Sequence, residues 1–198
     1  MLMSDYPSID RLSDLQQLIA DFAKVIRVPP LADTDRPEND VEHSFGLALT
    51  CWYLHPKIAP ELNLTKIFQY ALAHDIVELH AGDTFVFDHA NTQSKEQRER
   101  DAITKLKQDW SDFPDLTTYA EDYMNKQDEE ARFVKAVDKL LPVIMIELDK
   151  DPNAFWSNLN VTLGMERDNK VSIRVSEIVS PYYEMLLDWL KLRGHMRD

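Results

Sequence analysis

A histidine–aspartate pair in a mostly apolar segment carries the clearest chemistry in this sequence. His74 and Asp75 lie within residues 68–78, a run that otherwise favours a helix. An imidazole and a carboxylate are costly to bury unless a partner binds them. A divalent metal ion is such a partner, because it uses both groups as ligands. We therefore expect a metal site at this pair.

Two further residues are candidates for the same site. His43 lies upstream and Asp138 downstream, each in a segment with helical periodicity. Taken alone, His43 would usually be a hydrogen-bonded core residue and Asp138 a solvated carboxylate, so the inference depends on the whole set. Two imidazoles and two carboxylates suit Mn, Co, Mg, Fe or Zn. We expect one divalent ion, with coordination positions left for water and a substrate oxygen.

Two acidic residues follow the pair closely. Glu78 comes four residues after His74, which in a helix places both on one face. Asp83 comes directly after Gly82, a residue that is typical of a helix C-terminus. Both carboxylates are therefore expected near the ion.

The elements that must position these residues are predicted to be helices. The chain has only four glycines in 198 residues, and its apolar residues recur at helical spacing. Helices are predicted over residues 8–27, 41–54, 65–80, 94–110, 115–125, 128–149 and 170–192. A kink is expected at Pro142, residues 151–168 are expected to be rich in loops, and no stretch alternates as a strand would. The prediction is one all-α helical domain over residues 1–198, with a core of about 10–150 and a C-terminal helical extension of about 151–198.

Composition excludes several classes of function. The formal net charge of −13 disfavours a nucleic-acid polymer as partner but allows a small anionic substrate. No window approaches the roughly 20 apolar residues of a membrane span, and residues 1–30 lack an apolar secretory segment. The single cysteine, Cys51, excludes an internal disulfide. We expect a cytoplasmic protein with no membrane partner.

Taken in order, these motifs resemble those of the HD-domain phosphohydrolases, whose signature is H…HD…D on an all-helical scaffold. The matching elements are EHS at residues 42–44, HDxxExxxGD at 74–83 and VKxxD at 134–138. Residues 36–44, 95–100 and 129–139 extend the match, which covers roughly residues 10–150. The chain is most similar to the 5′-deoxynucleotidase branch, meaning the bacterial deoxyribonucleoside 5′-monophosphatases and their HD-domain relatives in eukaryotes.

The resemblance implies a role for each matching position. It implies an HD-domain helical bundle in which one divalent ion is bound by His43, His74, Asp75 and Asp138. Glu78 and Asp83 would be the catalytic acid and base carboxylates, in an order that stays open. Arg27, Arg36 and Lys95 would bind the substrate near its phosphate. One departure is Val28, which stands where the bacterial phosphatases have an aromatic residue.

The activity implied is that of a metal-dependent phosphomonoesterase. It would hydrolyse (deoxy)ribonucleoside 5′-monophosphates, small-molecule nucleotides, to nucleoside and phosphate. The alternatives are a phosphodiesterase or pyrophosphohydrolase acting on a cyclic nucleotide or alarmone, and a non-catalytic metal-bound HD module. A di-iron oxygen-activating protein is disfavoured by the lack of an ExxH pair.

Homodimer formation is also expected, because the resembled family often dimerises. Tyr182, Tyr183 and Trp189 could supply the dimer surface, or they could lie in the intramolecular core.

Overall fold

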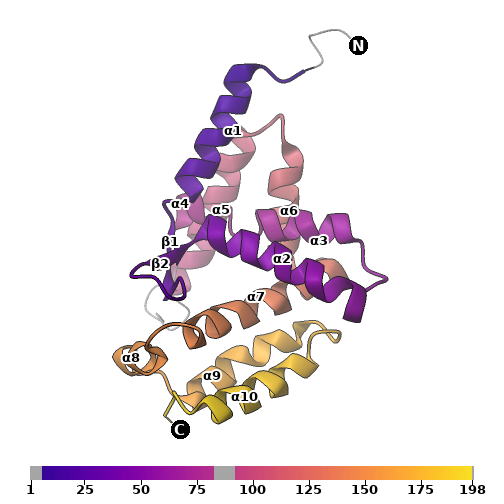
Figure 1. Cartoon of the computed structure of the whole chain (residues 1–198). Helices are drawn as coiled ribbons and strands as arrows, with labels where there is room; N and C mark the ends of the chain where they lie inside the picture. Colours follow the sequence, from indigo (N-terminus) through magenta and orange to yellow (C-terminus); the bar gives the residue numbers. More distant parts are fainter. Residues whose placement is uncertain (1–5, 83–91, 198) are drawn as a thin grey trace.

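The computed structural model describes residues 6–82 and 92–197, with side chains from residue 97 onward in the second range. These residues form an all-α fold, which confirms the predicted class (Figure 1). None of the described helices is long and apolar enough to span a membrane. The helices are α1 (Ile9–Phe22), α2 (Asp40–Ile58), α3 (Leu64–Ala73), α4 (Glu78–Ala81), α5 (Thr92–Asp109), α6 (Pro114–Asn125), α7 (Glu129–Glu147), α8 (Pro152–Asn158), α9 (Leu163–Lys170) and α10 (Pro181–Arg193).

A small antiparallel hairpin corrects the prediction that residues 8–27 are helical throughout and that strands are absent. Helix α1 ends at Phe22, and β1 (Ile26–Pro30) pairs with β2 (Pro37–Asn39). The proline after Val28 disfavours helical backbone at that residue, and the β-branched residues before it suit a strand. The hairpin therefore holds Arg27 and Glu38 in front of the N-terminus of α2.

The helix predicted over residues 65–80 is interrupted at the histidine–aspartate pair, which is a second correction. Helix α3 ends at Ala73, and residues 74–77 form a turn before α4 begins at Glu78. The Nδ1 atom of His74 lies 2.9 Å from the carbonyl oxygen of Ala71. That carbonyl is the one the Asp75 N–H would use in a continuous helix, so the side chain competes with the backbone. At Gly82, with φ of +74°, the chain then leaves α4 as expected.

Helix α7 continues through Pro142, so the proline does not break the helix. Proline has no N–H, so the carbonyl of Asp138 lacks its helical partner, but packing on both sides holds the helix. Residues 151–168 are also more ordered than predicted, because Asp151 and Thr162 cap α8 and α9. Helix α10 begins at Pro181, a favourable first helical position, and a 3₁₀ helix (Val171–Val175) precedes it.

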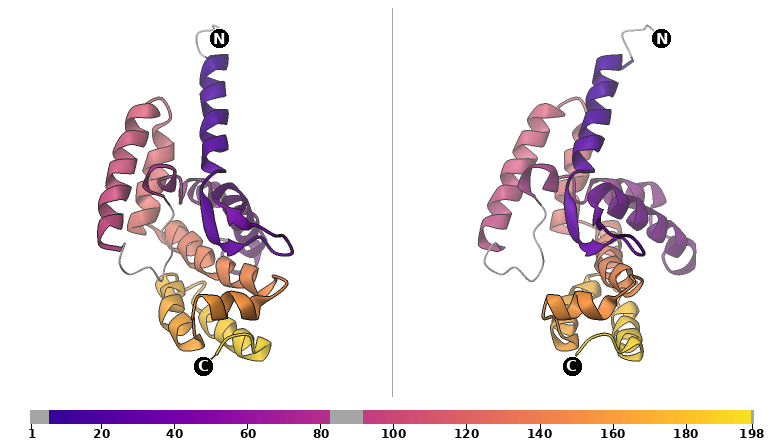
Figure 2. Two further views of the ribbon diagram at one scale, coloured as in Figure 1. Left: turned by 90° about the vertical axis from the view of Figure 1, so that its left-hand side faces the viewer. Right: turned by 60° about the vertical axis from the view of Figure 1, so that its left-hand side comes forward.

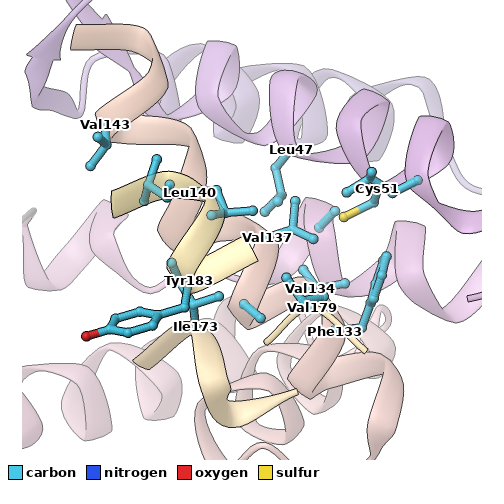
Figure 3. Packing of buried hydrophobic residues seen from close by; sticks show 14 of the residues in the cluster. Leu47, Cys51, Phe133, Val134, Val137, Leu140, Val143, Ile173, Val179 and Tyr183 are labelled. Atoms are coloured by element: carbon cyan, nitrogen blue, oxygen red, sulfur yellow. The ribbon is translucent and has the colours of Figure 1, made fainter. Parts of the chain in front are cut away.

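Helix α7 lies between two groups of helices. Helices α2 and α3 pack on one side of it and α8–α10 on the other, while α1 projects away at the end opposite the C-terminus (Figures 1 and 2). Figure 3 shows Leu47 of α2, Val137 and Leu140 of α7, Ile173 and Val179 in one apolar cluster. Residues beyond 150 therefore share a core with the residues that carry His43 and Asp138.

The C-terminal aromatic residues belong to this core. Tyr183 is buried, and Tyr182 and Trp189 pack against the same cluster. The intramolecular alternative thus describes these side chains better than a dimer surface does.

Candidate metal centre and its cavity

The structure brings together all four residues predicted to bind metal. His43 comes from α2, His74 and Asp75 from the end of α3, and Asp138 from α7. One ligand atom each of His43, His74 and Asp75 lies within 4.8 Å of the others, and the two imidazole centroids are 5.3 Å apart. Asp138 joins them through its Oδ1 atom, 3.0 Å from Nε2 of His43. Segments separated by up to 95 residues therefore converge on one point.

His74 shows that this set fits a cation. Its Nδ1 atom donates to the carbonyl of Ala71 at 2.9 Å, so Nε2 carries the lone pair in the neutral ring. Nε2 faces Oδ2 of Asp75 at 2.9 Å, is buried, and makes no hydrogen bond with any residue in the described ranges. Two acceptor atoms that face each other in a buried site need a positive charge between them. A divalent ion bound by two imidazoles and two carboxylates supplies that charge.

The carboxylates of the set are held in the ionised form that metal binding requires. Burial alone would raise the pKa of Asp75, but positive charge on His74 and on Arg27 brings it well below its usual range. A bound cation would supply this charge in place of a proton on His74. Burial acts in the same way on Asp138, where Lys139 and His43 bring the pKa well below its usual range.

His43 is shifted in the opposite direction. Burial alone would lower its pKa, but hydrogen bonds to Asp138 and Glu38 raise it to about 9. A cation among these groups would take the place of that proton, because metal-bound histidine is neutral.

Neighbouring side chains fix the orientation of the ligands. Arg27 donates from Nη1 to Oδ2 of Asp75 at 2.8 Å and to Oδ1 of Asp40 at 2.9 Å. Tyr123 donates its hydroxyl to Oδ2 of Asp138 at 3.0 Å, and Nζ of Lys139 lies 3.0 Å from the same oxygen. Such outer contacts are typical of metal sites and tune the ligands.

Sequence reasoning missed several of these groups. Oxygens of Asp40, Asp75 and Glu78 form a second cluster within 4.8 Å, although Asp40 was not predicted to be in the site. Its position three residues before His43 at a helix start was a usable signal. Tyr123 carries no signal in spacing, because it belongs to a different helix.

A cavity of about 200 Å³ opens beside the cluster. One end carries three of the four metal-ligand candidates, His74, Asp75 and Asp138, together with polar and charged neighbours, namely Arg27, Glu78, Glu99, Tyr123, Lys135 and Lys139. The rest of the wall comes from the C-terminal half of α7, from α8 and α9, and from Val28, Pro29, Val77 and Met124. Lys135 and Lys139 lie one turn apart on α7, so cations and metal ligands face the same space.

Four predicted residues are not placed in the lining of this cavity. His43 is buried and lies 3.0 Å from Asp138, but it does not line the cavity. Arg36 donates to Glu42 at 2.8 Å, is half exposed, and does not line the cavity. Asp83 lies outside the described residues. Lys95 belongs to α5, but its side chain also lies outside the described part.

Comparison with known proteins identifies the same family as the site does. The model of the HD domain matches residues 22–177, a range that contains all four metal-ligand candidates. Mouse 5′-deoxynucleotidase HDDC2 is 24% identical over 152 residues, covering 74% of this chain and 75% of the mouse protein.

Two solved structures are similar. The crystal structure of a predicted metal-dependent phosphohydrolase from Magnetospirillum magnetotacticum has a TM-score of 0.78 and 27% identity, covering 95% of this chain and 99% of that one. A conserved hypothetical protein from Pyrococcus furiosus shares the fold, with a TM-score of 0.63 and 21% identity over 88% of this chain and 98% of that one. The extent of the family match, together with the geometry of the H…HD…D residues, shows that this chain belongs to the HD-domain family.

Proposed function

We propose that this protein is a metal-dependent phosphomonoesterase that converts (deoxy)ribonucleoside 5′-monophosphates to nucleoside and phosphate. The observation that carries the proposal is the pair of facing acceptors, Nε2 of His74 and Oδ2 of Asp75, at the wall of a cavity lined with lysines. The similarity to a mouse 5′-deoxynucleotidase and to a predicted phosphohydrolase supports the choice of substrate class.

His43, His74, Asp75 and Asp138 would hold the ion. When bound there, a divalent ion supplies Lewis-acid chemistry, which polarises a phosphate oxygen and lowers the pKa of a bound water.

The other residues of the cavity would bind the phosphate and handle protons. Lys139 and Lys135 offer positive charge to the phosphate, and Arg27 lines the same wall while it orients Asp75. Glu78 is 7% exposed and lies within 4.8 Å of Asp75, where a carboxylate can position a water or protonate the leaving 5′-oxygen. Asp83 and the side chain of Lys95 lie outside the described residues. Their proposed roles, as a catalytic carboxylate and as a phosphate-binding cation, therefore depend on the sequence alone.

Phosphate release from a panel of nucleotides tests the proposal. Protein stripped with EDTA should be inactive and should recover activity with Mn, Co, Mg, Fe or Zn. The Asp75→Ala variant should lose both the metal, measured by elemental analysis, and dAMP hydrolysis, while its circular dichroism stays helical. Asp35→Ala is the matched control, because Asp35 is fully exposed.

Three results would contradict the proposal. Turnover of dAMP by the stripped protein would exclude a metal requirement. Faster hydrolysis of a cyclic nucleotide or an alarmone would favour the diesterase or pyrophosphohydrolase alternative. Bound metal without hydrolysis of any phosphoester would favour the non-catalytic module.

We also infer that two copies of the chain associate. Phe45, Leu49 and Trp52 form an exposed apolar stripe along α2, and the ring of Trp52 contacts that of Phe68 on α3. An exposed apolar stripe on one helix can pair with the same stripe of a second copy about a two-fold axis. Light scattering should give twice the chain mass for the wild type and the chain mass for Leu49→Glu. Leu192→Glu, at an exposed position on α10, should remain dimeric, and a monomeric wild type would exclude the dimer.

A further inference from the structure

Two buried side chains of opposite charge that are not among the metal ligands also line the cavity. Glu166 and Lys170 of α9 are 2% and 4% exposed, and both face the cavity. The wall around them is mostly apolar and includes Pro142, Val143, Ile146, Phe155 and Trp156. A polar pair in such a wall is a candidate for contact with a ligand.

The pair is incompletely satisfied within the protein. Nζ of Lys170 lies 3.7 Å from Oε2 of Glu166, beyond hydrogen-bond distance. That oxygen is buried and accepts no hydrogen bond from any residue that the structure describes. Leaving such an atom unpaired is costly, and apolar residues would often stabilise a buried position at least as well. Fold stability is therefore a weak explanation for these two charges.

The position of the pair suits the far end of a nucleotide. The cavity follows α7 from Asp138 to Ile146, which at 1.5 Å per residue is about 12 Å. A phosphate held at the Asp138 end would leave the sugar and base extending along the apolar wall toward α8 and α9. Asp138, Lys139, Glu166 and Lys170 all line this one cavity, so a single ligand can contact both groups of residues.

We propose that Glu166 and Lys170 bind the base of the nucleotide and favour guanine. The proposal rests on the proposed function, because the metal end sets the orientation of the substrate. Among the four bases, guanine alone presents two adjacent N–H donors, at N1 and N2, beside the O6 acceptor. The carboxylate of Glu166 accepts from those donors, and the ammonium group of Lys170 donates to O6. The phenyl ring of Phe155 and the indole of Trp156 supply apolar wall for the purine.

Nucleoside binding tests this without hydrolysis. In EDTA, the wild type should bind 2′-deoxyguanosine at least about tenfold more tightly than 2′-deoxyadenosine by calorimetry, the difference expected for one charged hydrogen bond. Glu166→Gln should abolish that preference. The matched control is Glu184→Gln on α10, since Glu184 is an exposed partner of Arg174 and should leave the preference intact.

Kinetics separate this proposal from the proposed function. Glu166→Gln should lower kcat/KM for dGMP about tenfold and leave that for deoxyribose 5-phosphate, which has no base, unchanged. Equal wild-type affinity for the two nucleosides, or an unchanged preference in Glu166→Gln, would overturn base recognition even if nucleotides are hydrolysed. A guanine preference in calorimetry without any hydrolysis would overturn the phosphatase function and leave base recognition intact. Lys170→Met provides a second test if Glu166→Gln does not fold.

Discussion

The charge states of single side chains decide what the centre can bind. Asp75 and Asp138 have pKa values held well below the usual range despite burial, so both are ionised at neutral pH. The charge of Asp138 in turn raises the pKa of Lys139, against the effect of burial, so this lysine stays protonated. The centre thus combines anionic oxygens for a metal ion with a cation for a phosphate.

Substitution of Glu78 separates metal binding from turnover. Glu78→Gln preserves the size of the side chain but removes its capacity to take a proton, so kcat should fall about 100-fold or more with the bound metal unchanged. Metal content and dAMP hydrolysis are measured on the same sample. Glu61→Gln, at an exposed position, should retain full activity. Near-wild-type turnover in Glu78→Gln would remove Glu78 from proton transfer.

At the level of helices and strands, the sequence predicted the elements but not their junctions. Apolar periodicity located α1, α2 and α7 because those helices bury one face. It could not show the break after Ala73, because a side-chain hydrogen bond from His74 replaces a backbone one there. The hairpin was missed for a similar reason, since a strand as short as Pro37–Asn39 has no periodicity to read.

The residues of the site also divide into those that the sequence predicts and those that it does not. The order of His43, His74, Asp75 and Asp138 in the sequence identified a metal set that the fold then brings together. Partners contributed by other elements, such as Tyr123 of α6, depend on helix packing and could not be predicted from spacing.

Asp128 tests how the start of α7 is held. Its side chain caps the helix through the Ala131 N–H at 2.9 Å, accepts from the Tyr70 hydroxyl at 2.8 Å, and pairs with Lys66. Asp128→Ala should lower the free energy of unfolding in urea by about 1–2 kcal/mol, the usual cost of losing a cap. Asp35→Ala is the exposed control. No measurable change would mean that packing alone fixes the start of α7.

The same residue predicts a pH dependence. Burial would raise the pKa of Asp128, but Lys66, the Ala131 N–H and Tyr70 lower it below the usual value. Its charge therefore stabilises the fold above about pH 4, the unfolded value, and this contribution is lost as the pH falls through the lower folded pKa. The stability difference between wild type and Asp128→Ala should accordingly shrink at acidic pH.

At the scale of the whole molecule, the C-terminal helices complete the cavity rather than merely extending the chain. Helices α8 and α9 supply Phe155, Trp156 and Lys170 to its wall. Their position depends on Glu147, a buried residue at the end of α7. Its Oε1 atom accepts from Nε1 of Trp156 at 2.8 Å, and Oε2 lies 2.8 Å from Nδ1 of His195.

Glu147 therefore couples global stability to the far end of the cavity. Arg193 also contacts Glu147, donating to its Oε2 at 3.3 Å and to its carbonyl oxygen at 2.6 Å. Glu147→Ala leaves the buried indole N–H of Trp156 without its acceptor, removes the carboxylate partner of Arg193 and His195, and should cost about 3 kcal/mol in urea unfolding. Because Trp156 loses its anchor, nucleoside affinity should fall while metal content stays unchanged, since the metal ligands lie at the other end of the cavity. Glu184→Ala, on the exposed face of α10, should change neither quantity. Loss of metal together with nucleoside binding would instead mean that the two ends of the cavity are not held independently.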